Sequence, residues 1–405
     1  MVNMTFRKVL FTSVQRIWRV DTTDGSQAPG RGGPAGTVPR PRVALAAGAL
    51  LLVACDGAAA PDPAVGHVAE EYSAAVDSAR AILDSLIAAE DIPGLSVAVG
   101  RGSELIWSEG FGFSDLTHDV KVTPLTRFRI GSVSKPYTAA ALAHLVEDGA
   151  LDLDAPVRTY VPSWPVKRWP ITTRQLAGHL AGIRHYRGME NFSAVPYPTV
   201  LSGLEIFQDD TLMSEPGTTY AYSSYGWNLV SAVIEGASGE PFLDYMDRMV
   251  FEPLAMTHST ADWVRPVIPH RTRFYIRNED GEVVNAPYVD NSYKWAGGGF
   301  LSTPEDILLF ANAHLEPGYL EAETLEMLFA SQTRLDGTET GYGLGWRSTT
   351  NDHGEAIVSH TGGSVGGRTV MTLNRDNGLI VAIVANLSSA PMSNTLAARI
   401  EALFR

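Results

Sequence analysis

The chain has 405 residues, of which 45% are hydrophobic and 19% charged, and this composition is typical of a globular protein long enough to bury a large core. Its formal net charge is -14, and an acidic chain without a basic patch argues against nucleic acid as a partner. The single cysteine, Cys55, excludes an intramolecular disulfide.

The N-terminal residues 1–54 predict an upstream segment followed by a lipoprotein signal peptide. The apolar run at 43–54 is too short to span a bilayer, but it suits the core of a signal peptide. Its end, Leu52-Val53-Ala54-Cys55, resembles a bacterial lipobox, in which the cysteine is lipidated. The alternative is a signal peptide that is cut near Ala58–Ala60 and has an incidental cysteine. We therefore expect an exported protein of the bacterial cell envelope, anchored to the membrane through lipid on Cys55.

The next elements in chain order are a tether, a helix and a hairpin. Residues 55–70 are rich in Ala, Gly and Pro and predict a flexible tether. The domain itself is expected at 71–405. Apolar residues three or four positions apart predict a helix from Glu70 that ends before Pro93-Gly94. Two strands are then predicted at 95–100 and 104–112.

A second pair of strands is predicted near the other end of the chain, at 369–374 and 379–384. The latter is apolar throughout, so we expect both of its faces to be covered. A closing helix follows at about 396–403, whereas helical patterns broken by Pro and Gly fill roughly 137–290. The predicted fold class is α/β (α+β). Its antiparallel sheet is built from both chain ends and flanked by helices, with an inserted, mainly helical region.

A serine followed by a lysine three positions later begins the predicted helix after the hairpin. On a helix, Ser132 and Lys135 share one face. A serine hydroxyl is a poor nucleophile unless a base takes its proton, and a lysine removed from water in a cleft is able to do so. The alternative is a capping serine with a solvated lysine. The position between a strand-like run and an apolar helix favours the catalytic interpretation.

The run from Phe128 to Thr138, F-R-I-G-S-V-S-K-P-Y-T, closely resembles the nucleophile segment of class C beta-lactamases and related penicillin-binding esterases and peptidases. Further segments resemble that family in the same order, and the shared order is more specific than any single motif. They are His179–Ile183, Pro216–Ser224, Gly297–Asp306, Tyr342–Trp346 and His360–Gly363. The resemblance covers 71–405 and implies a serine beta-lactamase/transpeptidase-like fold.

The resemblance implies a role for each residue at the site. Ser132 would attack the substrate carbonyl and form an acyl-enzyme, and Lys135 and Tyr222 would share the proton transfers. Which of the two is the base stays open. Tyr220 is the alternative tyrosine, but the position of Tyr222 in the motif favours the latter. The backbone N–H groups of Ser132 and Gly363 would form the oxyanion hole.

Two positions depart from the family pattern. The tyrosine motif ends in Ser224 where the family usually has asparagine, which puts binding of a substrate amide in doubt. His360 replaces the lysine of the Lys-Thr-Gly strand, which weakens carboxylate binding. We assign substrate binding to Ser224, His360, Thr361 and Gly362. We expect His360 to titrate between about pH 5 and 8, with KM for anionic substrates rising as it loses its proton. The alternative is that His360 is a packed strand residue whose ring never meets the substrate.

The sequence thus predicts a serine hydrolase acting on a peptide, ester or amide small-molecule substrate. We expect a peptidase, esterase or D,D-carboxypeptidase-like enzyme more than an efficient beta-lactamase. A different class of function is a catalytically weak or inactive penicillin-binding-type module that binds cell-wall peptides. Retention of Ser132, Lys135 and Tyr222 together argues against that alternative.

No cofactor and no metal ion are expected. The sequence has no His-Glu-x-x-His motif, and His179 and His185 are interpreted as loop histidines held by hydrogen bonds. Within the family, His185-Tyr186 and the run Pro287 to Thr303 resemble the mitochondrial serine beta-lactamase-like subgroup of animals. We interpret the chain as a bacterial homologue of that subgroup. The sequence leaves the oligomeric state open.

Overall fold

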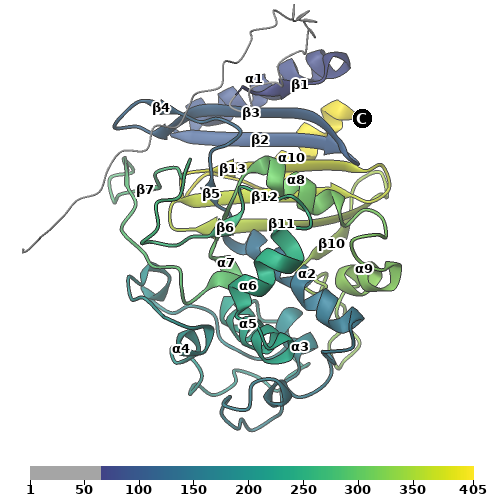
Figure 1. The fold of residues 1–405 in the computed structure, drawn as a ribbon. Helices are drawn as coiled ribbons and strands as arrows, with labels where there is room; N and C mark the ends of the chain where they lie inside the picture. Colours follow the sequence, from purple (N-terminus) through teal and green to yellow (C-terminus); the bar gives the residue numbers. More distant parts are fainter. Residues whose placement is uncertain (1–64) are drawn as a thin grey trace, which may run out of the picture. The chain divides into compact units, whose positions relative to one another are not determined.

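An eight-stranded sheet forms the centre of the fold (Figure 1). In the computed structural model, which describes residues 65–405, its strands follow the order β1-β3-β2-β13-β12-β11-β10, with β4 beside β3. Every neighbouring pair is antiparallel. The strands are β1 (His67–Val68), β2 (Gly94–Arg101), β3 (Glu104–Asp115), β4 (Val120–Lys121), β10 (Arg347–Thr350), β11 (Ala356–Ser364), β12 (Gly367–Asn374) and β13 (Leu379–Ala385). The predicted sheet from both chain ends is confirmed.

The first strand lies within the predicted tether. His67 and Val68 of β1 pair with Ser108 and Trp107 of β3, so the end of that segment belongs to the sheet. The rest of the predicted tether that precedes Val65, the predicted signal peptide and Cys55 lie outside the described residues.

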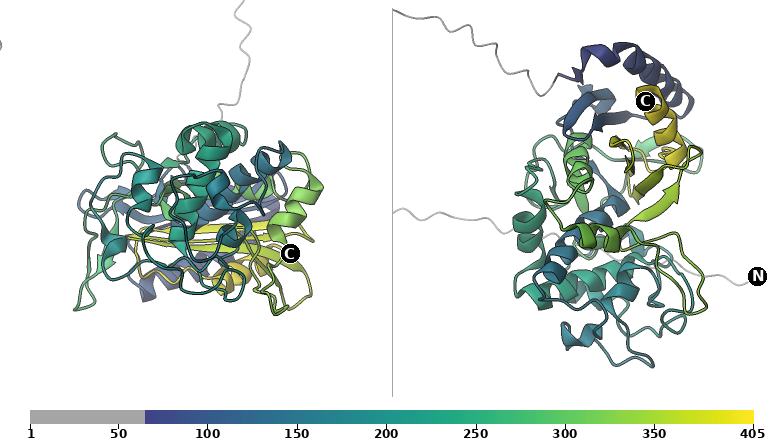
Figure 2. Two further views of the ribbon diagram at one scale, coloured as in Figure 1. Left: turned by 90° about the horizontal axis from the view of Figure 1, so that it is seen from below. Right: turned by 90° about the vertical axis from the view of Figure 1, so that its right-hand side faces the viewer.

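The middle strand β13 is covered on both faces, as its apolar sequence predicted. Val381 and Ile383 point to one core, together with residues of α1 (Ser73–Ala89) and α10 (Asn394–Glu401). Ile380 and Ala382 point to the other core, together with residues of α2 (Ser134–Glu147) and α8 (Pro304–Asn312). The alternation follows from the two-residue period of a strand. Helices α1 and α10 lie side by side in both figures (Figure 2).

The region between the two halves of the sheet is mainly helical, and it contains short strands (Figure 1). Its small sheet has the order β5-β9-β6, and a hairpin joins β7 to β8. The remaining elements are β5 (Phe128–Arg129), α3 (Thr173–Ala177), α4 (Val200–Leu204), α5 (Ser224–Ser238), α6 (Phe242–Met246), β6 (Thr260–Ala261), β7 (Tyr275–Arg277), β8 (Val283–Asn285), α7 (Trp295–Gly298), β9 (Phe300–Ser302) and α9 (Ala322–Phe329). No helix within 65–405 is both long and apolar enough to cross a membrane.

A buried ion pair ties the chain before α2 to the large sheet. Arg129 of β5 is only 4% exposed. Its Nε donates to the Asp262 carboxylate at 2.6 Å, and its Nη1 donates to the Val365 carbonyl at 2.7 Å. A buried cation is costly unless it is paired and hydrogen-bonded in this way. The pair therefore holds the turn that enters α2 next to the end of β11.

Candidate active site

The turn before α2 brings Ser132 to the edge of the large sheet. Gly131–Val133 form a short 3-10 helix that leads into α2. Gly131 has φ 51°, and a Cβ there would lie 2.6 Å from both the N and the O of Gly363. Only glycine fits this backbone and this close approach. As a result, Ser132 lies at the start of α2, directly beside β11.

Lys135 extends from the first turn of α2 into a completely buried position with three partners. Its Nζ lies 3.0 Å from Ser132 Oγ, 3.1 Å from Ser224 Oγ and 2.6 Å from the Gly297 carbonyl oxygen. The partners come from three separate elements: the turn before α2, the start of α5, and α7. The pairing of Ser132 with Lys135 that the sequence predicted is thus present as a hydrogen bond.

Burial lowers the pKa of Lys135 well below its ordinary value, and the positive charge of Lys294 lowers it further. An uncharged amine has two N–H donors and one lone pair. Gly297 offers only an acceptor, and the Ser224 hydroxyl accepts as well, so these two take the N–H groups. The lone pair is left for the proton of Ser132. The three contacts therefore match an amine that is ready to act as a base.

Tyr222 faces the same pair of residues from the loop before α5. Its ring centre lies 4.8 Å from Lys135 Nζ, and Ser132 and Ser224 lie close enough to its hydroxyl to oppose in part the effect of burial on its pKa. Burial raises the pKa of Tyr222, so the phenol keeps its proton. Tyr220 instead packs against the rings of His179 and Tyr342, with centroids 5.9 and 6.2 Å away.

Two histidines hold the segment that carries Tyr222, and the sequence did not reveal this role. The backbone N–H of Ser223 donates to Nδ1 of His179, and that of Ser224 donates to Nδ1 of His185, both at 3.1 Å. His179 is buried, has φ 60°, and stacks on the Tyr222 ring at 4.2 Å. Both are indeed loop histidines held by hydrogen bonds. The unusual backbone of His179 has no signal in the sequence.

The backbone of β11 approaches Ser132 closely enough for an oxyanion hole. A Cβ on Gly362 would lie 1.9 Å from the Ile130 carbonyl oxygen and 3.2 Å from the Ser132 nitrogen. The glycines of this strand therefore allow main chain to lie against main chain. The next residue is Gly363, whose N–H we assigned to the oxyanion hole together with that of Ser132. The proximity is compatible with that assignment, which stays a prediction.

His360 differs from the expectation for its position. It is 2% exposed, its Nε2 lies 2.8 Å from the Tyr342 hydroxyl, and its Nδ1 lies 2.6 Å from the Thr361 carbonyl oxygen. Burial lowers the pKa of His360 to about 3. The predicted titration between about pH 5 and 8 is therefore wrong, because the ring is removed from water and both of its nitrogens have internal partners.

Ser224 is also less available than a substrate-binding residue should be. It is 3% exposed, and Lys135 Nζ lies 3.1 Å from its hydroxyl oxygen. Thr361 is half-buried and Gly362 is buried on β11. Their assignment to substrate binding stays a prediction.

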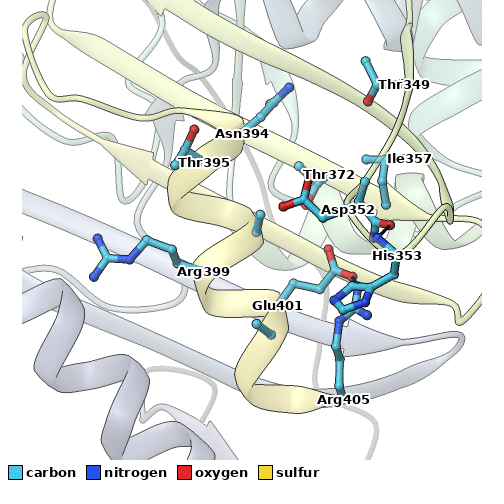
Figure 3. Close-up of a pocket in the computed structure, with 13 residues that line it drawn as sticks. Thr349, Asp352, His353, Ile357, Thr372, Asn394, Thr395, Arg399, Glu401 and Arg405 are labelled. Atoms are coloured by element: carbon cyan, nitrogen blue, oxygen red, sulfur yellow. Dashed lines mark hydrogen bonds and ion pairs between the residues drawn. The ribbon is translucent and has the colours of Figure 1, made fainter.

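A hollow lies on the other face of the sheet, between α10 and the edge strands (Figure 3). It measures about 440 Å³, and its lining includes Thr372, Asn394, Arg399 and Glu401. Ser132 and its partners are absent from that lining, so this hollow is separate from the site at α2. Among the residues that the structure describes, no group of three or more His, Cys, Asp or Glu is placed to hold a metal ion.

The fold and the cluster around Ser132 together define the class of serine beta-lactamases and penicillin-binding proteins. The comparison with known families gives the same result, because the beta-lactamase family matches residues 79–404. The chain belongs to this family, which generally consists of serine hydrolases.

Individual relatives agree with this assignment. The mitochondrial serine beta-lactamase-like protein of Homo sapiens is 32% identical over 80% of this chain and 79% of the human protein. The octameric penicillin-binding protein homologue from Pyrococcus abyssi is a solved structure with TM-score 0.72 and 26% identity, covering 81% of this chain and 77% of that one. D-amino acid amidase from Ochrobactrum anthropi shares the fold, with TM-score 0.71 and 22% identity over 82% of this chain and 99% of its own.

These relatives also correct the predicted location. The proteins of Homo sapiens, Mus musculus and Bos taurus, which match 80%, 81% and 80% of the chain, are mitochondrial. They contradict a lipid-anchored protein of the bacterial envelope. The sequence misled here because an N-terminal segment with basic side chains and few acidic ones is common to signal peptides and mitochondrial targeting segments. Cys55 lies outside the described residues.

Proposed function

We propose that the protein is a serine hydrolase that forms an acyl-enzyme on peptide, amide or ester bonds. The observation that carries the proposal is the contact of the buried Lys135, whose pKa burial lowers, with the Ser132 hydroxyl at 3.0 Å. A nucleophile and its base within hydrogen-bond reach are what acyl transfer requires.

In the acylation step, Ser132 Oγ attacks the substrate carbonyl carbon while its proton passes to Lys135 Nζ. The Tyr222 hydroxyl lies near Ser132. It passes a proton to the leaving nitrogen or oxygen as that bond breaks, and Lys135 returns a proton to the tyrosine oxygen. The negative charge on the carbonyl oxygen is stabilised by the N–H groups of Ser132 and Gly363.

In the deacylation step, water takes the place of the leaving group. Its proton passes through Tyr222 to Lys135 as its oxygen attacks the ester carbonyl. The ester bond then breaks, and Ser132 recovers its proton from Lys135. Each group ends in its starting protonation state, so the cycle needs no cofactor.

The environment of His360 supports a peptidase or esterase rather than an efficient beta-lactamase. The family resemblance implies a permanent cation at this position to bind a substrate carboxylate. Here, an uncharged and buried imidazole bonds Tyr342 instead. A beta-lactam carboxylate therefore lacks that ionic partner.

A fluorophosphonate probe tests the proposal directly, since it labels only an activated serine. We expect labelling at Ser132, turnover of a p-nitrophenyl ester, and loss of both in Ser132→Ala. A folded wild-type protein that binds peptides but is neither labelled nor active would favour the non-catalytic binding module.

A further inference from the structure

The cleft contains one more polar side chain, His185, whose hydrogen atom is fixed by its surroundings. The Ser224 N–H donates to Nδ1 of His185 at 3.1 Å. A ring nitrogen that accepts carries no hydrogen, so the uncharged ring has its hydrogen on Nε2. The backbone of α5 thus makes His185 a donor on the side of the ring that faces away from Ser224.

The ring is also held in orientation. It stacks on Tyr186 with centroids 4.5 Å apart and planes inclined by 29°. Its other neighbour is Tyr222, which it meets edge to face at 5.8 Å. Unlike His179 and His360, which are 2% exposed, His185 is exposed. An oriented donor therefore reaches solvent beside the catalytic tyrosine.

Ser224 cannot serve as this donor. Its hydroxyl lies 3.1 Å from Lys135 Nζ, and the residue is only 3% exposed. The Ser224 hydroxyl is therefore occupied by Lys135 and removed from solvent. His185, which the Ser224 backbone N–H contacts, is exposed instead.

We propose that His185 is a specificity-determining residue whose Nε2–H binds a second carbonyl oxygen of the substrate, apart from the carbonyl that Ser132 attacks. This inference rests on the proposed hydrolase function. It identifies the substrate class as peptides and N-acylamino esters or amides, which carry an amide carbonyl next to the scissile bond. Simple alkanoate esters lack that group.

A carbonyl is favoured over a carboxylate because the donor is uncharged. Desolvation by its packing partners lowers the pKa of His185 to about 4, and the charge of Lys294 acts in the same direction. Glu190 opposes them, while Tyr186 and Tyr222 on either side are neutral phenols. The ring therefore stays neutral at pH 6 and above, and it recognises a neutral acceptor.

The test compares two substrates of equal length, an N-acetylamino-acid p-nitrophenyl ester and a p-nitrophenyl alkanoate. The N-acetylamino-acid ester is used in both its L and its D form. His185→Asn keeps an acceptor for the Ser224 N–H but has no donor at the reach of Nε2, whereas His185→Gln keeps such a donor. We expect the ratio of kcat/KM, acetylamino over alkanoate ester, to fall about tenfold in His185→Asn. In His185→Gln it should stay within about threefold of wild type.

His179→Asn is the matched control, because His179 holds the Ser223 N–H in the same way but is buried. It should lower both kcat/KM values together and leave their ratio unchanged. The tenfold effect in His185→Asn should also be constant from pH 6 to 9.

An unchanged ratio in His185→Asn, with wild-type enzyme active and labelled at Ser132, would overturn this inference and leave the proposed function intact. A ratio that grows as the pH falls would also overturn it, since it would indicate a charged ring and an anionic ligand. A wild-type protein without labelling or turnover would instead overturn the proposed function.

Discussion

The two elements beside Ser132, α2 and β11, each contain a buried basic side chain whose pKa is lowered by burial. At α2, Lys135 gives its two N–H groups to Gly297 and Ser224, and its lone pair faces Ser132. At β11, both nitrogens of His360 are occupied by Tyr342 and Thr361. The same lowering of the pKa thus produces a base at α2 and a structural contact at β11. The difference is that an uncharged Lys135 keeps a lone pair for Ser132, whereas both nitrogens of His360 are occupied.

The largest effect expected from this comparison is at the nucleophile. Ser132→Ala removes the attacking oxygen, and kcat should fall by about 10⁴- to 10⁶-fold. The melting temperature should change little, because only one small, half-exposed hydroxyl is lost. Ester turnover and thermal unfolding measure the two effects. A variant that keeps more than a tenth of wild-type turnover would exclude Ser132 as the nucleophile.

Next in size is the effect of the base. Lys135→Met has similar length but no lone pair, and the rate of acylation should fall by about 10²- to 10⁴-fold. His360→Gln, on β11, should lower it by less than tenfold. The rate of fluorophosphonate labelling measures both. Equal losses in the two variants would contradict the distinction between a base and a structural contact.

The pH dependence of the rate sharpens the role of Lys135. Activity requires its neutral form, so kcat/KM should fall as the pH drops through the pKa of Lys135. The charge of Lys294 helps to lower that pKa, and Lys294 itself has a pKa lowered by burial to about 7. Lys294→Met should therefore raise the pKa of Lys135 and move the acidic limb of the profile to higher pH. A shift to lower pH would contradict this electrostatic coupling.

The same comparison shows how far the sequence alone could lead. The apolar pattern of Leu379–Ala385 and the spacing of Ser132 and Lys135 depend on neighbours in the chain, and both indicated the local structure correctly. The state of His360 depends on Tyr342, 18 positions away in sequence, and on burial that forms only in the folded protein. The role of His185 likewise depends on a backbone N–H 39 positions later. Contacts between residues so far apart in the chain leave no pattern among neighbouring residues in the sequence.

The smallest expected effect concerns stability, and it tests His360 without reference to any substrate. The pKa of His360 is lowered to about 3 in the folded protein, whereas that of an unfolded histidine is about 6.5. The stability that comes with the neutral ring is fully present above the pKa of the unfolded histidine. It is lost progressively as the pH falls from that pKa through the pKa of the folded protein. At pH 5 this loss is about 2 kcal/mol of the free energy of unfolding.

His360→Gln cannot take up this proton, so its unfolding free energy should fall less than that of wild type between pH 7.5 and 5. At pH 7.5 the variant should be less stable than wild type by about 1–3 kcal/mol, because the Tyr342 hydroxyl loses its fitted partner in a buried site. Urea unfolding at the two pH values measures both differences. If His360→Gln and wild type lose equal stability on acidification, His360 is protonated in the folded protein, and the contrast between Lys135 and His360 fails.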